Sequence, residues 1–269
     1  LTSSSIIRPQ RHFDILTYTG DQTDGTRSIT GLEFTPEFVW LKCRSSATSH
    51  NIYDSVRGFG ANKEICSDKS QVEGGEVGAQ YGYVNQNSRG FDLVAGSDST
   101  LGSRVYNINI NSATYVAWCW KAGGGAVANS NGTITSQVSA NQESGFSIVT
   151  YTGNGSGSGQ TVGHGLGKAP KVIFLKKRNA ATNWFVYHGA AGNGAFEGLN
   201  TTAAYGSGLG TFNSTAPSST VVTLGNTDGN QSGINFVLYC WAEIPGYSKF
   251  GVYRGNNNVD GSYIDLGFK

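Results

Sequence analysis

The chain has little charge, no methionine and no long apolar run. Charged residues make up 14% of its 269 residues and the formal net charge is +1, whereas ~25% of an average protein is charged. Its longest basic run is residues 176–178, so nothing indicates a nucleic-acid or membrane-surface partner. No apolar stretch nears the ~20 residues of a membrane helix, and residues 1–8 lack the apolar core of a signal peptide. We therefore expect no nucleic-acid partner and no membrane insertion.

Glycine and aromatic residues are abundant, with 39 glycines and 12% aromatics. A disordered chain would lack those aromatics. Short runs such as 13–18 and 38–43 alternate between two faces, and Gly-containing turn signals separate them. This spacing predicts an all-β fold of tandem antiparallel β-sandwiches, concanavalin-like or jelly-roll-like, with an open barrel as second choice.

The sequence repeats itself. FDILTYTG (13–20) returns as FSIVTYTG (146–153), EFVWLKCR (37–44) as KVIFLKKR (171–178), and TYVAWCWKA (114–122) as NFVLYCWAE (235–243). Blocks that recur in one order with nearly fixed gaps indicate a duplicated β unit. FGVYRG (250–255) and DGSYIDLGFK (260–269) resemble the start of a third copy.

Five segments follow from the repeat. We predict a leading segment (1–12), a first sandwich repeat (13–123), a linker with a leading strand (124–145), a second repeat (146–247) and the start of an incomplete third repeat (248–269). Because a strand without partners exposes an edge, we expect that Lys269 is not the biological C-terminus. The missing initiator methionine suggests the same of Leu1.

The runs 114–121 and 235–242 are apolar on both faces. Such a strand is central in its sheet and covered on each side. The second cover could be loops of the same unit or a neighbouring subunit.

Cysteine usage favours reduced thiols. Cys119 and Cys240 hold the same position in the two repeats, too far apart for a disulfide if the repeats are separate domains. Buried free thiols are the expected state, although a bond between Cys43 and Cys66 stays open. This usage indicates assembly in a reducing cytoplasm.

No catalytic or metal-binding pattern stands out, and we expect neither an enzyme nor a cofactor. Glu33 and Glu37 have the spacing of paired carboxylates, but the aligned residues of the second repeat are Gly167 and Lys171, so solvated side chains are the expectation. The Asx-rich run 226–233 resembles a calcium loop without its final Glu, and the Gly-rich run 153–168 lacks a nucleotide fingerprint. No zinc-ligand spacing connects the four histidines, His12, His50, His164 and His188.

Two segments combine aromatic and polar residues, as sugar-binding surfaces do. They are YGYVNQNSRGF (81–91) and NWFVYHG (183–189). Tyrosine at alternate strand positions is more often packing than ligand contact, so the ligand-binding residues stay unknown at this stage.

Several motifs together resemble a known family. The chain is similar to β-sandwich repeats in structural proteins of marine tailed bacteriophages, particularly those of cyanobacteria and abundant ocean bacteria. Members resemble concanavalin-like sandwiches and carry no established catalytic residues, so no site residue is implied. The resemblance rests on RPQRHFDILTYTG, TGLEFTPEFVWLKCR, NIYDSVRG, TYVAWCWKAGG, GFSIVTYTGNG, TVGHGLGKAPKVIFLKKR and AEIPGYSKFGVYRGN.

The resemblance implies a non-enzymatic virion protein, expected to be a tail fibre or spike component that contacts the host surface. The alternatives are a capsid head-decoration protein, and a lectin-like carbohydrate-binding module or glycan hydrolase. Expected partners are other virion proteins, further copies of the chain (a trimer is one option) and a host glycan or receptor. The expected location is the virion.

Overall fold

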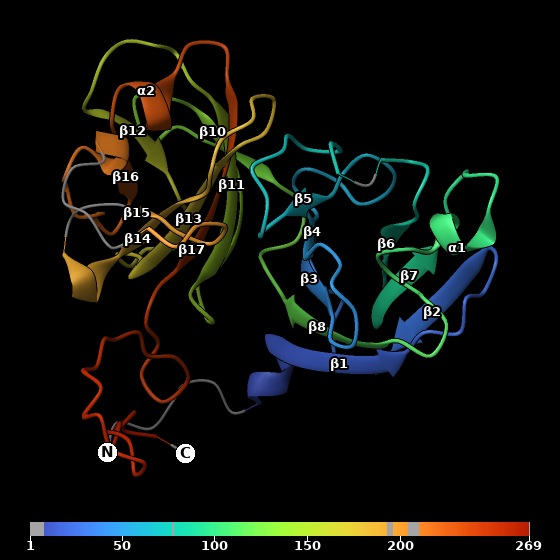
Figure 1. Cartoon of the computed structure of the whole chain (residues 1–269). Helices are drawn as coiled ribbons and strands as arrows, with labels where there is room; N and C mark the ends of the chain where they lie inside the picture. Colours follow the sequence, from blue (N-terminus) through green and yellow to red (C-terminus); the bar gives the residue numbers. More distant parts are fainter. Residues whose placement is uncertain (1–7, 77, 193–195, 204–209, 269) are drawn as a thin grey trace.

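Antiparallel strands make up most of the molecule. The computed structural model describes residues 8–268 apart from 77, 193–195 and 204–209. Within them every helix is a single turn of three or four residues. The predicted all-β sandwich fold is confirmed, and two bodies of strands lie side by side (Figure 1).

The first sandwich has a five-stranded main sheet over a smaller three-stranded sheet. Their facing side chains, among them Tyr115, Cys119 and Phe91, form one closed core. The first main sheet runs β1 (Phe13–Thr19), β8 (Thr114–Trp120), β3 (Phe38–Cys43), β4 (Asn51–Asp54), β5 (Ile65–Cys66); the smaller sheet runs β2 (Thr26–Thr30), β7 (Gly90–Val94), β6 (Tyr83–Asn87); the short helices are η1 (Pro9–Arg11) and α1 (Leu101–Arg104).

The second sandwich has a related plan, with two further strands at one edge of its main sheet and a partner sheet of two strands where the first has three. Its core includes Tyr151, Phe236 and Leu238. The second main sheet runs β15 (Phe196–Glu197), β14 (Phe185–His188), β13 (Val172–Lys177), β17 (Asn235–Trp241), β11 (Phe146–Thr152), β10 (Ser136–Asn141), β9 (Val127–Asn129); its partner sheet pairs β12 (Gln160–Gly163) with β16 (Val221–Leu224); the short helices are η2 (Gly189–Ala191), η3 (Gly210–Phe212) and α2 (Thr227–Asn230).

The strand orders β1-β8-β3-β4-β5 and β11-β17-β13-β14-β15 correspond one to one. Register corresponds too: Trp120 lies between Phe13 and Phe38, as Trp241 lies between Phe146 and Val172. The doubly apolar strands β8 and β17 are central, as predicted. A duplicated unit would have this topology; the duplication itself and the predicted segment boundaries stay predictions.

The segment between the sandwiches is more ordered than expected. The predicted leading strand forms as β10, which pairs with β11. Part of the expected flexible link forms β9, which pairs with β10 over residues 127–129. The described residues of the leading segment, 8–12, contain the short helix η1 and no strand. Pro9 has no backbone N–H to donate to a sheet.

Residues 250–268, the expected third start, contain no strand. Val252, Tyr253 and Tyr263 are exposed there, while Phe250 packs beside both sandwiches. All four cysteines are free and buried, so the Cys43–Cys66 bond left open by the sequence does not form. No helix in the described ranges is long and apolar enough to cross a membrane.

The two main sheets share an aromatic core, which we call the junction. Phe38 lies at its centre, with ring centroids 5.6 Å from Phe146 and 4.8 Å from Tyr239. The doubly apolar strands are therefore covered on their second side by the other sandwich of the same chain, and not by the loops of the same unit or the neighbouring subunit expected from the sequence. It is complete over β17 but partial over β8, where Trp118 and Trp120 are only half-buried.

Polar contacts fix the junction. Trp184 Nε1 of the second sandwich donates to the Cys66 carbonyl of the first at 2.9 Å. Lys176 Nζ donates to the Ser70 carbonyl at 3.1 Å, and burial lowers the pKa of this amine to about 8. Side chains that reach across in this way hold the two sheets in one relative orientation.

A fully buried ion pair lies at the junction. Arg57 and Asp54 pair with both side chains fully buried, and Tyr239 of the other sandwich donates its hydroxyl to Asp54 Oδ2 at 2.6 Å. Burial alone would lower the pKa of Arg57, but the Asp54 carboxylate raises it, so the guanidinium stays charged. Its remaining donors reach the carbonyls of Lys63 (2.7 Å) and Ile52 (3.2 Å).

Candidate functional site at the junction cleft

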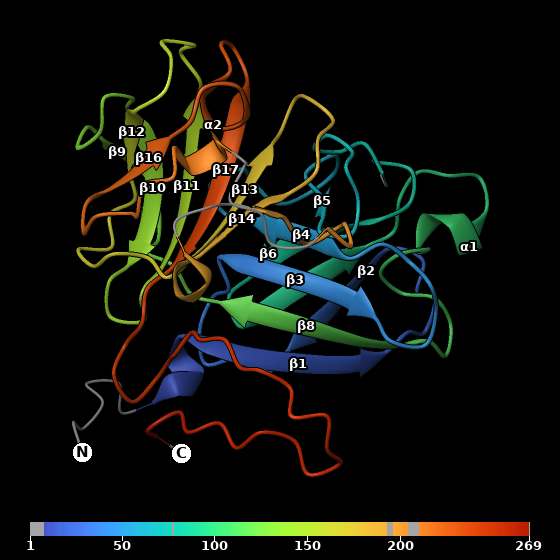
Figure 2. The same cartoon turned by 60° about the vertical axis from the view of Figure 1, so that its left-hand side comes forward.

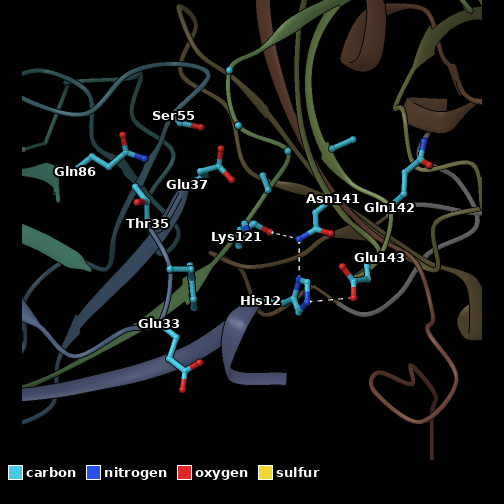
Figure 3. Close-up of a pocket in the computed structure, with 16 residues that line it drawn as sticks. His12, Glu33, Thr35, Glu37, Ser55, Gln86, Lys121, Asn141, Gln142 and Glu143 are labelled. Carbon is cyan, nitrogen blue, oxygen red and sulfur yellow. Dashed lines mark hydrogen bonds and ion pairs between the residues drawn. The ribbon is translucent and has the colours of Figure 1, made fainter. Parts of the chain in front are cut away.

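A polar cleft of about 950 Å³ opens where the first sandwich, the linker and the second sandwich meet. We call it the junction cleft. Three carboxylates, one histidine and several amides face it from these segments (Figure 3). Its lining side chains include His12, Glu33, Thr35, Glu37, Ser55, Gln86, Lys121, Asn141, Gln142 and Glu143.

His12 connects the start of the first sandwich to the turn after β10. The Asn141 side-chain amide contacts His12 Nδ1 at 3.0 Å, and Glu143 Oε1 lies 3.6 Å from Nε2 (Figure 3). With Asn141 as donor, the neutral ring carries its proton on Nε2, facing Glu143. Burial lowers the pKa of His12, despite the opposing effect of Glu143. The ring is therefore a neutral bridge at physiological pH.

Glu37 lies in the cleft wall and is only 6% exposed. Burial raises the pKa of its carboxyl group, although the backbone N–H groups of Ala122 and Gly124 donate to it and oppose the shift. These bonds tie the first residues of the linker to the first sandwich. The interpretation of Glu37 as a solvated side chain is wrong, because the linker folds back over it.

Glu33, the other carboxylate of the pair, is exposed as expected. Its oxygens lie 3.1 Å from Arg8 and 3.3 Å from Arg11. Both Glu33 and Glu37 line the same cleft (Figure 3), although neither belongs to a strand. The ion pairs and backbone bonds of these carboxylates suit a role in positioning chain segments and accepting hydrogen bonds.

The glycan-binding interpretation of 183–189 is not supported. Trp184, Phe185 and Tyr187 are buried. In 81–91, Phe91 is buried and Tyr83 packs on the first core. The aromatics of both segments therefore serve mainly as packing, which was the alternative weighed for them.

The candidate ion and nucleotide loops are structural turns. Asn230, in the run 226–233, is buried. Its Oδ1 accepts the Asn154 backbone N–H at 2.9 Å, and its Nδ2 donates to Asn154 Oδ1 at 2.8 Å. The Gly-rich run 153–168 contains β12. Among the residues described here, no group of three His, Cys, Asp or Glu side chains could hold a metal ion.

Sequence reasoning missed His12 as a cleft residue, and also Lys121, Asn141 and Glu143. His12 lies just before the duplicated motifs, and Asn141 and Glu143 lie between them. Lys121 lies inside an aligned motif, but its counterpart there is Ala242, so the alignment marks none of the four. Their spacing along the chain carries no chemical signature. The one sequence signal that could have indicated these cleft residues was their position along the chain, because the linker must pass between the two sandwiches.

Replacing Glu37 with glutamine should flatten one part of the pH dependence of stability. Because the folded-state pKa is raised, the folded chain binds the proton more tightly than the unfolded chain does. The stabilisation that protonated Glu37 gives to the folded state is fully present below the ordinary pKa of Glu. It is lost as pH rises through the raised pKa of the folded state. Urea unfolding at a series of pH values should thus show the parent weakening relative to Glu37→Gln as pH rises.

Glu33→Gln is the control, because it removes an exposed carboxylate from the same cleft. Parallel stability curves for the parent and Glu37→Gln across this pH range would contradict the assigned environment of Glu37.

Comparison with known families gives one match. The family model described as "Domain of unknown function (DUF7483)" matches residues 8–269, nearly the whole chain. No curated protein and no solved structure matches it significantly.

Proposed function

We propose that this chain, which belongs to the DUF7483 family, is a non-enzymatic structural protein of a tailed-bacteriophage virion. Its role would be that of a tail fibre or spike component that contacts the host surface. The motifs of the two repeats, which resemble virion β-sandwich repeats, support this role. The junction supports it physically, since a fibre must transmit force between consecutive modules.

The fused junction is the observation that carries the proposal. Domains joined by linkers move relative to one another unless their interface is large and apolar. Here Phe38, Phe146 and Tyr239 are fully buried between the sandwiches, and the Arg57–Asp54 pair lies beside them. Moving the two sandwiches apart would expose both this aromatic surface and the buried ion pair. Two such modules behave as a stiff segment, which suits a load-bearing appendage.

Adhesion would come from many weak contacts multiplied by copy number. The junction cleft is the natural place for such a contact, because its carboxylates and amides can bind hydroxyl-rich ligands. A second candidate function, carbohydrate binding or glycan hydrolysis in this cleft, is favoured by the buried Glu37 with its raised pKa.

Locating the chain in intact virions tests the leading role. Labelled antibodies against the folded protein should mark tail appendages in electron micrographs. Label over the capsid surface would favour a head-decoration protein instead, and no label on purified particles would overturn the virion role.

A glycan array combined with a reducing-sugar assay separates adhesion from catalysis. We expect weak binding without release of sugar, and binding that falls for Glu37→Gln or Asn141→Ala. Release of reducing sugar by the parent but not by Glu37→Gln would replace the non-enzymatic proposal with hydrolysis.

A further inference from the structure

Four cationic side chains gather around one cavity beside the junction cleft. The cavity has a volume of about 540 Å³ and is lined by Arg8, Arg11, Arg89, Lys121 and a single carboxylate, Glu33. We call it the basic cavity. Four positive charges and one negative charge leave its lining with an excess of three, whereas the whole chain has a formal net charge of +1. A cavity lined mainly by charge of one sign concentrates ions of the opposite sign.

Arg8 and Arg11 already hold a carboxylate in this cavity. Their guanidinium groups lie 3.1 and 3.3 Å from the two oxygens of Glu33, one on each oxygen. All three side chains remain more than one third exposed to solvent. Each contact uses one nitrogen of a group that has five N–H donors. The cavity therefore already contains the contact that a carboxylate ligand would make, and each guanidinium has further donors for a second one.

Arg89 and Lys121 contribute charge that no carboxylate of the chain neutralises, because within the described residues neither takes part in an ion pair. Backbone contacts fix both residues. The Arg89 carbonyl accepts the N–H groups of Gly31 and Leu32 at 3.0 and 3.1 Å, and Arg89 Nε donates to the Leu32 carbonyl at 3.1 Å. The Lys121 N–H donates to the His12 carbonyl at 2.8 Å, and the end of β8 lies beside η1 in both views (Figures 1 and 2).

The basic cavity is continuous with the junction cleft, because Glu33 and Lys121 line both (Figure 3). Burial raises the pKa of Glu37 in the cleft wall, and the charge of Lys121 opposes this rise, so the amine lies within electrostatic range of the cleft. The cleft offers amides and carboxylates, which hydrogen-bond hydroxyl groups, and the basic cavity offers cations. A ligand that fills both carries hydroxyl groups and an oxyanion on one chain.

We propose that the basic cavity binds a carboxylate of an acidic glycan, whose neighbouring sugar lies in the junction cleft. On the proposed role in host contact, on which this assignment rests, the glycan is one of the host surface that contains uronic acids. Arg89 and Lys121 are the groups that bind the carboxylate, since guanidinium and ammonium groups form charge-assisted hydrogen bonds with it. A nucleic acid fits less well, because Glu33 and Glu143 would repel consecutive phosphates along the same cleft.

Isothermal titration calorimetry of the full chain tests the class of glycan. The probe is a hyaluronan tetrasaccharide, in which uronic acids alternate with N-acetylated sugars, and the neutral comparison is a chitin tetrasaccharide. We expect the hyaluronan probe to bind about tenfold more tightly, which is the effect of one charge-assisted contact. The difference should shrink as added salt screens it.

Three results would overturn the inference. They are equal binding of the two tetrasaccharides, no binding of hyaluronan, and equal or tighter binding of a thymidine oligonucleotide that carries the same charge as the hyaluronan probe. The last result would assign the basic cavity to a nucleic acid.

Two variants locate the site. Arg89→Gln and Lys121→Gln should each weaken hyaluronan binding by about tenfold and leave the chitin affinity nearly unchanged. Lys121→Gln keeps the backbone bond to His12, so it remains informative if Arg89→Gln, which loses the Nε bond to Leu32, is destabilised. Arg44→Gln is the matched control, because Arg44 is an exposed arginine of the first sandwich that lines neither cavity.

The Arg44→Gln variant should bind hyaluronan like the parent. Hyaluronan binding that Arg89→Gln and Lys121→Gln both leave intact would contradict the assigned site. The carboxylate site and the virion role fail separately. Calorimetry on the purified chain decides the first, and antibody labelling of intact particles decides the second.

Discussion

Replacing Trp184 with alanine should lower the free energy of unfolding by about 3–5 kcal/mol. The indole is fully buried, stacks near Tyr239 at 6.3 Å and donates to the Cys66 carbonyl of the other sandwich. Truncation leaves a cavity at the junction and removes the shorter of the two hydrogen bonds to the Cys66 carbonyl, which keeps only the Lys69 N–H at 3.4 Å, and each of these changes costs stability. Chemical denaturation followed by tyrosine and tryptophan fluorescence measures the loss.

Trp118→Ala is the matched control for this change. Trp118, on β8, is only half-buried, so its truncation should cost clearly less. Equal losses for the two variants would mean that Trp184 is no more buried than Trp118, contrary to the structure.

Replacing Arg57 with alanine should be comparably damaging, again by about 3–5 kcal/mol. The loss comes mainly from Asp54, which would stay buried without its counter-charge beside the Tyr239 hydroxyl. Thermal and urea unfolding of the variant measure it. Asp54→Asn with Arg57→Ala should recover part of the loss, because the uncompensated charge is gone.

An exposed ion pair provides the comparison. Arg104 and Asp24 pair at 2.9 Å near the surface, and Arg104→Ala should cost only about 0–1 kcal/mol. If Arg57→Ala cost no more than Arg104→Ala, the Arg57–Asp54 pair could not be a buried anchor of the junction.

The positions of several strands could be predicted because they depend on the local alternation of apolar and polar residues. Alternation in 13–18 and 38–43 gave β1 and β3, and the doubly apolar run 235–242 gave the central strand β17. What covers the second apolar face of β17 could not be predicted from this pattern. A doubly apolar strand shows that a cover exists, but loops, a second sandwich and another chain bury it equally well.

The buried ion pair at the junction could not be predicted from the sequence, for a related reason. Arg57 and Asp54 look like surface residues in sequence, and His188 holds the Asp54 position in the second repeat. Both are buried against Tyr239, which lies 185 residues after Asp54. The junction cleft depends likewise on His12 meeting Asn141 across the linker, a contact set by tertiary packing and not by local spacing.

Differential scanning calorimetry tests most directly whether the two sandwiches form one stiff body. A shared core predicts a single transition whose calorimetric enthalpy equals its van't Hoff enthalpy. In Trp184→Ala that transition should broaden or split as the sandwiches uncouple. Two separate transitions in the parent, one for each sandwich, would contradict a common core at the junction and the load-bearing role drawn from it.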